Sequence, residues 1–157
     1  MTKRSTTHAT FVIEREYRTA PARVFAAFSD LKNKSKWFGG PEGWAVASAH
    51  KLDFRVGGKE SVSGGPPGGT VHSYNATFWD IVENERIVSA YEMHLDKVRI
   101  SVSLATTEIK ASGAGARLIY TEQGVYLDGY DDAGQREQGT NELFDKLEAF
   151  LSGKGAP

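Results

Sequence analysis

The chain has 157 residues, no cysteine and a formal net charge of −1, with 39% hydrophobic and 25% charged residues. This size and composition predict one globular domain with a sizeable core. The lack of cysteine excludes disulfides, thiol nucleophiles and cysteine-ligated zinc, and is typical of a cytoplasmic protein. The near-zero net charge argues against general affinity for nucleic acid, and no apolar run approaches the ~20 residues that span a bilayer.

Residues 1–9 predict a flexible polar tail. Two basic residues there precede no apolar stretch, so a signal peptide is not expected. Residues 10–18 alternate in the pattern of a half-buried strand. Both faces of this strand carry bulky side chains, so the sequence does not decide which face points into the core. Pro21 then suits the first turn of a helix, whose apolar stripe is Val24, Phe25, Phe28 and Leu31.

The middle of the chain predicts six strands separated by turn-forming residues. They cover residues 44–54, 59–63, 70–82, 86–95, 97–111 and 116–127, and the Gly-Pro-rich segment 64–69 is a loop. Among them, residues 97–111 alternate most clearly, with Val98, Ile100, Val102 and Leu104 on one face. The inner face of residues 70–82 stays ambiguous, since a bulge would exchange inner and outer positions.

The final element is a long amphipathic helix over residues 134–153, with Asp132 and Gln135 placed as a capping box. Its stripe in the C-terminal half consists of Leu143, Leu147, Phe150 and Leu151, flanked by Phe144. Extended backwards, the same face carries Thr140, Gly139 and Arg136. These residues do not fill space as leucine does. We therefore expect a core that is packed at one end of the helix and hollow or polar at the other.

A resemblance to a known family rests on several motifs in a fixed order. They are "TAPARVFAAFSD", "KWFGG", "LDFRVGG", "ATFWDIVENERIV", "ARLIYTEQGVYLDGYDD" and "REQGTNELFDKLEAFL". The sequence resembles the helix-grip (SRPBCC) superfamily of START and Bet v-type domains, and within it the AHSA-like relatives of the activator of the heat-shock-protein-90 ATPase. The resemblance covers residues 10–152 as one domain, followed by a tail over 153–157.

The family implies an α+β fold of order β-α-α-β6-α, in which a curved antiparallel sheet of about seven strands wraps around the C-terminal helix. It also implies an internal cavity between the sheet and that helix. It implies no single activity, because members include lipid carriers, cyclases, hydrolase-like enzymes and co-chaperone domains.

Glu122 is the main polar candidate, because it shares a strand face with Leu118 and Tyr120 and would point inward with them. A buried carboxylate needs a partner, which Arg136 could provide. The pair could anchor a ligand, Glu122 could be a general acid or base, or both could be purely structural. The family topology adds Trp37, Tyr126 and Phe144 at the cavity mouth, and Tyr74 and Tyr91 as wall residues.

No metal or cofactor site is expected. His8, His50, His72 and His94 have no metal-ligand spacing and are more simply satisfied or exposed strand residues. Asp128, Asp131 and Asp132 lack the pattern of an EF-hand.

The preferred hypothesis is a binding protein that holds a small, largely apolar molecule in the cavity. One alternative is a cyclase, dehydratase or hydrolase acting on an aromatic or polyketide-like substrate, with Glu122 as the catalytic group. Another is a chaperone accessory protein, and pairing of edge strands could give a homodimer.

Overall fold

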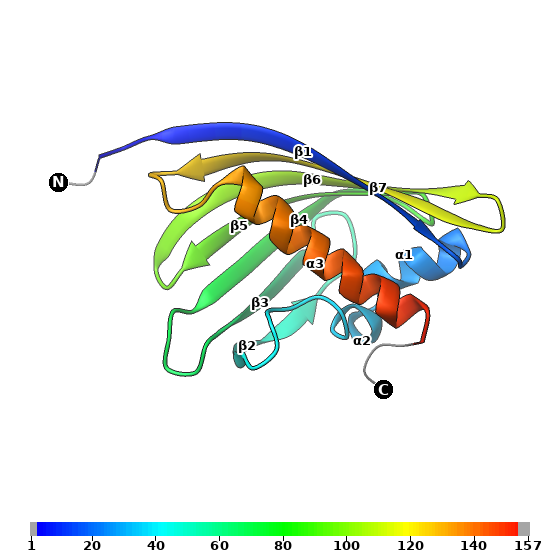
Figure 1. The fold of residues 1–157 in the computed structure, drawn as a ribbon, viewed down its shortest axis with the longest axis horizontal. Helices are drawn as coiled ribbons and strands as arrows, with labels where there is room; N and C mark the ends of the chain where they lie inside the picture. The colour runs from blue at the N-terminus through cyan, green and yellow to red at the C-terminus, as the bar shows by residue number, and fades with distance from the viewer. Residues whose placement is uncertain (1–2, 154–157) are drawn as a thin grey trace.

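The computed structural model describes residues 3–153, which form seven strands and three helices (Figure 1). In chain order these are β1 (Thr6–Tyr17), α1 (Pro21–Ser29), α2 (Leu31–Lys34), β2 (Ala45–Leu52), β3 (Lys59–Gly65), β4 (His72–Val82), β5 (Arg86–Leu95), β6 (Val98–Ser112), β7 (Gly115–Leu127) and α3 (Ala133–Leu151). The predicted α+β helix-grip order is therefore confirmed.

All seven strands pair antiparallel in one sheet, in the order β1-β7-β6-β5-β4-β3-β2. The sheet curves, and α3 lies diagonally across its inner side, with α1 and α2 near the C-terminal end of α3 (Figure 1). A sheet with one apolar face needs such a cover, which α3 provides.

The first strand begins earlier than its sequence indicates. Residues 6–9, predicted as part of a flexible tail, pair with residues 124–127 of β7, and Thr6 lies opposite Leu127. The tail prediction is wrong for these residues, because pairing with a long neighbouring strand extends β1 where local composition gives no signal. Of the predicted C-terminal tail, all but Gly153 lies outside the described residues.

The helix after β1 is divided in two at Asp30. The extended backbone of Asp30 ends α1. The Asp30 side chain accepts a hydrogen bond from the Lys32 amide at 2.9 Å and so caps α2. Pro21 begins α1 as predicted. The short α2 directs Lys34 inward.

At the start of α3, Asp132 is the N-cap and accepts from the Gln135 amide at 2.9 Å, as predicted. The reciprocal half of the capping box is not made, since the Asp132 amide donates instead to Asp131 at 2.8 Å.

The structure settles the faces that the sequence left open. On β1, Phe11, Ile13 and Tyr17 are buried, whereas Val12 is 52% exposed. On β4 the inward residues include Ala76 and Phe78, and an irregularity between Phe78 and Asp80 interrupts the register.

The four apolar residues predicted to share one face of β6 are divided, since Ile100 is buried whereas Val98 is 42% exposed. Ser101, Ser103 and Ala105 are buried, while Val102 and Leu104 are 43% and 40% exposed on the outer face. The inward serines leave room and hydrogen-bonding groups where leucines would have filled space.

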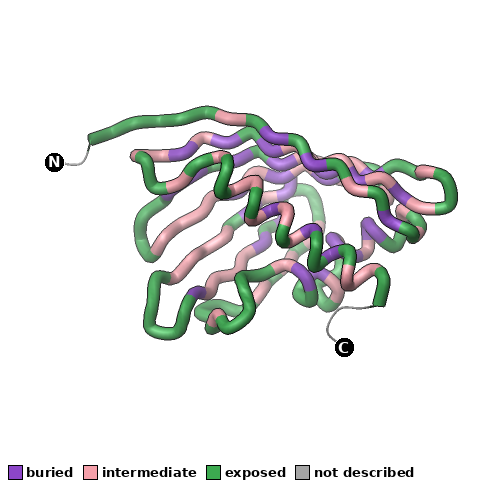
Figure 2. The backbone as a smooth tube through the Cα atoms, viewed as in Figure 1, coloured by how far each residue is buried: buried purple, intermediate pink, exposed green. Residues whose placement is uncertain are grey.

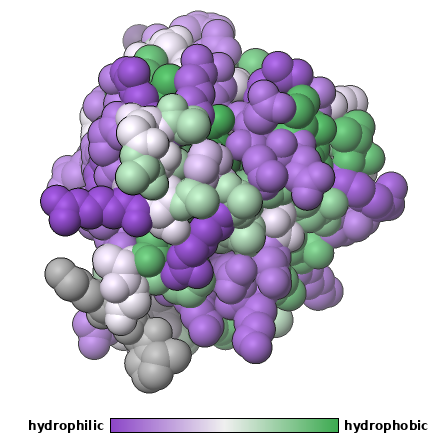
Figure 3. All heavy atoms as spheres, turned by 90° about the vertical axis from the view of Figure 1, so that its right-hand side faces the viewer, coloured by the Kyte–Doolittle hydropathy of each residue, from purple (hydrophilic) through white to green (hydrophobic). Residues whose placement is uncertain are grey.

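The packed core lies at the α1 end of the molecule. Buried residues are most frequent where α1, the C-terminal half of α3 and β1 converge, whereas the strands on the other side of α3 are mainly of intermediate burial (Figure 2). The outer surface at the packed end carries mostly hydrophilic side chains with scattered hydrophobic ones (Figure 3). The core thus leaves the sheet under the N-terminal half of α3 partly open.

Candidate functional site

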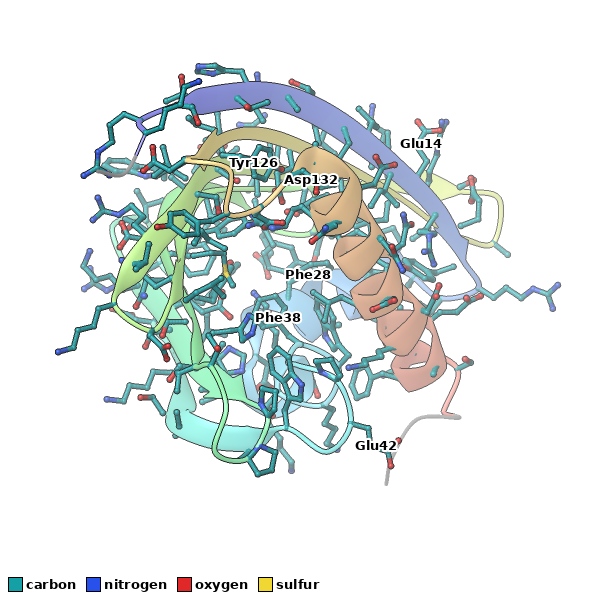
Figure 4. All side chains as sticks on the ribbon, turned by 60° about the vertical axis from the view of Figure 1, so that its left-hand side comes forward. Glu14, Phe28, Phe38, Glu42, Tyr126 and Asp132 are labelled. Atoms are coloured by element: carbon teal, nitrogen blue, oxygen red, sulfur yellow. The ribbon has the colours of Figure 1, made fainter. Side chains whose placement is uncertain are left out.

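A hollow of about 1280 Å³ lies between the sheet and α3. Strands β2 to β7 contribute its walls, α3 covers it from Gln135 to Lys146, and the segment from Lys34 to Val46 closes one side. Phe28 and Phe38 lie in the enclosed space, whereas Glu14 and Glu42 lie on the outside (Figure 4). The volume exceeds the usual 300–1,000 Å³ of small-molecule sites.

Aromatic rings line much of this hollow. Tyr74 lies between Phe38 and Tyr91, with ring centroids 4.9 Å and 4.8 Å away. On the side of α3, Phe144 contacts Tyr120 at 5.2 Å and Trp37 at 6.4 Å. Tilted and edge-on contacts of this kind hold rings in fixed orientations.

Trp37 is held from behind by α1. Its indole nitrogen donates to the carbonyl of Ala27 at 2.9 Å, and its residue is 2% exposed. This bond satisfies the only polar atom of the side chain, so the ring presents an apolar surface to the hollow.

Glu122 is fully buried beneath two tyrosines. Its Oε1 accepts hydrogen bonds from the hydroxyl of Tyr91 at 2.8 Å and from the hydroxyl of Tyr120 at 2.6 Å. Burial, followed by the charge of Glu122, raises the pKa of both tyrosines well above the ordinary value of 10. Both phenols therefore stay protonated and donate to the carboxylate.

Arg136, on the first turn of α3, joins this cluster. Its guanidinium donates to Tyr91 at 2.9 Å, to Ser101 at 2.7 Å and to Asp131 at 2.8 Å. It also lies 3.6 Å from Oε2 of Glu122, which confirms the expected pairing. Burial would lower the pKa of Arg136, but Tyr91 and the two carboxylates outweigh it and the pKa lies above its ordinary value.

Three buried polar atoms of β6 and β7 have no hydrogen-bond partner among the described residues. They are Oε2 of Glu122, Oγ of Ser103 and the hydroxyl of Tyr126. A Cβ on Gly124 would lie 3.1 Å from both the Ser103 oxygen and the Tyr126 oxygen. The glycine therefore lets the side chains of Ser103 and Tyr126 approach the backbone of β7 closely.

The seven residues predicted as ligand contacts divide into two groups. Five of them line the hollow, namely Trp37, Tyr74, Tyr91, Arg136 and Phe144. Glu122 and Tyr126 are buried but are not part of the lining. The expectation that they face the hollow directly is thus wrong, because Tyr91, Tyr120 and Arg136 stand between Glu122 and the open space. Whether the five bind a ligand stays a prediction.

A second polar cluster was not anticipated. Glu60 on β3 is 1% exposed, and its two carboxylate oxygens each lie 2.7 Å from a nitrogen, Nζ of Lys34 and Nε2 of His50. Lys34 and His50 line the hollow. In the sequence, the one indication of an inward position is that His50 shares a strand face with Leu52. Lys34 lies in a basic and polar segment, which predicts exposure.

The loop between α2 and β2 is fixed at the edge of the hollow by two contacts. The ring of Trp44 lies 4.5 Å from that of His72, and Lys146 on α3 donates to the carbonyl of Gly40 at 3.0 Å. Both bridge elements far apart in the chain, so the edge of the site is held by side chains and not by the loop alone.

Over residues 3–153, the side chains of His, Asp and Glu form no group of three that could hold a metal ion. Within the same residues, none of the helices combines the length and apolar character needed to cross a bilayer.

The sequence model of the Activator of Hsp90 ATPase homolog 1-like proteins matches residues 18–152, which include α1, α2, β2 to β7 and α3. The chain belongs to this AHSA1 family. No curated protein matches it.

Solved structures of related proteins share the AHSA1-family fold. An uncharacterised protein from Rhizobium leguminosarum is 46% identical, with a TM-score of 0.91, and the match covers 96% of this chain and 99% of that one. A protein from Rhizobium loti is 42% identical, with a TM-score of 0.86 over 93% and 99% of the two chains. The AHSA1 protein from Silicibacter pomeroyi is 28% identical, with a TM-score of 0.75 over 92% and 98%.

Proposed function

We propose that this protein binds a small, largely apolar molecule in the hollow between the sheet and α3. The observation that carries the proposal is the volume of about 1280 Å³ combined with the aromatic lining. An apolar ligand gains about 25 cal/mol for each Å² of apolar surface that it removes from water. Trp37 and Phe144 offer such a surface, because the indole N–H of Trp37 is already bonded to Ala27 and Phe144 has no polar side-chain atom.

The polar groups at the wall would orient the ligand. Arg136 and Tyr91 are held in place by Glu122 and Asp131 before any ligand arrives. Preorganised groups lose little conformational freedom on binding, which favours affinity. In this proposal Glu122 and Tyr126 support the wall and do not touch the ligand.

Mass spectrometry under native conditions tests the proposal. The purified chain is incubated with a small-molecule extract of bacterial cells, separated from excess extract, and measured before and after treatment with organic solvent. We expect a discrete additional mass that the solvent removes. A spectrum that contains only the mass of the polypeptide would contradict the proposal.

The enzymatic alternative is less well supported by the contacts of Glu122. A general acid or base must reach the substrate, whereas Oε1 of Glu122 is engaged by two tyrosines and the residue does not line the hollow. Homodimerisation and binding of a chaperone, which the family description suggests for its namesake, stay predictions.

A further inference from the structure

Two cationic side chains, Lys34 and Arg136, line the hollow and are only 7% and 11% exposed. Cations in a ligand site commonly bind a carboxylate or phosphate group of the ligand. Their availability to an anion depends on the charges that already surround them. Each of the two lies against a fully buried carboxylate of the protein, Glu60 beside Lys34 and Glu122 beside Arg136.

The guanidinium of Arg136 faces two carboxylates. Its Nη2 donates to Asp131 at 2.8 Å, and its Nη1 lies 3.6 Å from Oε2 of Glu122. The same guanidinium also donates to the neutral hydroxyls of Tyr91 and Ser101. Arginine is charged at any ordinary pH, so one positive charge stands here against two negative ones. This group of side chains is therefore net negative.

The ammonium of Lys34 is matched by a single carboxylate. Its Nζ lies 2.7 Å from Oε1 of Glu60 and 4.5 Å from the centre of the Phe38 ring, which covers it on another side. Burial would raise the pKa of Glu60, but the ammonium of Lys34 and the hydrogen bonds from His50 and Lys34 lower it below its ordinary value. Glu60 is thus ionised near neutral pH, and its pair with Lys34 is neutral.

The wall has no excess of positive charge in either protonation state of His50, whose Nε2 lies 2.7 Å from Glu60. With a neutral imidazole the two groups together carry one net negative charge, and with a protonated one they carry none. Burial lowers the pKa of His72, the other histidine of the lining, which keeps it neutral near pH 7. The exposed charged residues of the lining, all on α3, add two negative charges and one positive: Glu142, Asp145 and Lys146.

We propose that the hollow selects electrically neutral ligands and excludes anions, including the carboxylates of fatty acids. An anion that entered would lose its hydration, and the charges of the wall would offer it no net attraction in return. In this proposal Lys34 and Arg136 are counterions of the buried Glu60 and Glu122 and do not anchor a negative charge of the ligand. The inference rests on the proposed function and narrows its ligand class.

The test compares two fluorescent dyes that share one skeleton, the neutral N-phenyl-1-naphthylamine and 8-anilinonaphthalene-1-sulfonate, which adds an anionic sulfonate. Both are titrated at neutral pH against the wild type and against Gly139→Trp, whose indole would enter the hollow. Binding that persists in Gly139→Trp is subtracted, because it lies on the outer surface. We expect the hollow of the wild type to bind the sulfonate at least about ten-fold more weakly than the neutral dye.

The variant Asp131→Asn separates the charge of the sulfonate from its size. It removes one negative charge beside Arg136 at nearly constant side-chain shape, so the preference for the neutral dye should fall at least about five-fold. The control Asp128→Asn removes the same charge from the same loop. The carboxylate of Asp128 also accepts from one amide and one arginine, but it lies outside the lining of the hollow. This control should keep the preference of the wild type.

The comparison of the two dyes in the wild type stands on its own if Asp131→Asn does not fold, which circular dichroism determines. Equal affinity of the wild-type hollow for both dyes, or tighter binding of the sulfonate, would overturn the inference and leave the binding function intact. A preference that a folded Asp131→Asn leaves unchanged would do the same, since it would reflect the size of the sulfonate. Saturable binding of neither dye would contradict the proposed function and the inference together.

Discussion

The hydroxyl of Tyr91 donates to Oε1 of Glu122 at 2.8 Å, and the same hydroxyl accepts from Arg136 at 2.9 Å. One phenol on β5 thereby joins a carboxylate on β7 to a guanidinium on α3. Because Glu122 is fully buried, this chain of contacts ties the sheet to the start of α3. It fixes the helix over the hollow at the end where few apolar side chains pack against it.

The variant Glu122→Gln should lower the free energy of unfolding by about 1–3 kcal/mol, because an amide nitrogen would face the guanidinium of Arg136 in place of a carboxylate oxygen. Urea denaturation measures the change. The control Glu14→Gln affects an exposed pair with Arg117 and should cost no more than ~1 kcal/mol. Unchanged stability of Glu122→Gln together with lost turnover of an aromatic substrate would instead favour the enzymatic alternative.

The variant Lys34→Met should destabilise the protein by about 3–5 kcal/mol near neutral pH, because Glu60 would be left as a buried carboxylate without its ammonium partner. The folded-state pKa of Glu60 is lowered in the wild type. The ionised Glu60 therefore stabilises the fold above the glutamate pKa of the unfolded chain, about 4.3. This stabilisation is lost as pH falls through the lower pKa that Glu60 has in the folded protein.

Urea titrations at pH 7 and at pH 3 check this dependence. The penalty of Lys34→Met should be smaller at pH 3, where Glu60 in the variant is protonated. The control Lys32→Met, on the exposed side of α2, should change stability by less than ~0.5 kcal/mol at both values. A penalty for Lys34→Met that does not depend on pH would contradict the buried ion pair.

Alkaline pH should destabilise the fold through its tyrosines. Burial raises the pKa of Tyr126 to about 12, and it raises the pKa values of Tyr17, Tyr74, Tyr91 and Tyr120 further. Since the unfolded chain loses these protons near pH 10 and the folded chain does not, stability is retained below pH 10 and falls as pH rises towards the folded values.

Absorbance at 295 nm, which detects tyrosinate, provides the measurement. At pH 11 the native protein should show far less tyrosinate than the protein in concentrated urea. Similar absorbance in the two states at pH 11, with circular dichroism still native, would contradict the burial of these hydroxyls.

The substitution Gly139→Ala should stabilise the protein by about 0.5–1 kcal/mol. Glycine in the middle of a helix costs about this much relative to alanine, and no atom lies within 4 Å of the added Cβ. Thermal unfolding should show a higher midpoint. A lower midpoint would mean that the face of α3 at Gly139 is closely packed, against the open space described above.

The sequence predicted the elements of this fold well, because they depend on local patterns. The stripe of Leu143 and Leu147 identified α3, and the alternation of residues 116–127 placed Glu122 on the buried face of β7. The change from leucine to Gly139 and Arg136 along α3 predicted where the core would be incomplete.

The remaining features depend on distant contacts. Glu60 and His50 meet Lys34 only because β2, β3 and α2 converge, and none of the three stands out in its own segment. Tyr91 covers Glu122 because β5, β6 and β7 pair in this order. The sequence could therefore predict that Glu122 is buried, but not that Tyr91 separates it from the hollow. On β6 the alternation predicted one shared face for Val98, Ile100, Val102 and Leu104, but Ile100 is buried and the other three are exposed.

The central claim is that the space beneath α3 accepts an apolar molecule, and a blocking substitution tests it most directly. The indole of Gly139→Trp would enter the hollow, whereas that of Gln138→Trp, one residue earlier on the exposed side of α3, would point to solvent. Each protein is titrated with the apolar fluorophore N-phenyl-1-naphthylamine. We expect saturable binding by the wild type and by Gln138→Trp, and at least about ten-fold weaker binding by Gly139→Trp. Equal affinity of all three proteins, or no saturable binding by the wild type, would contradict the account.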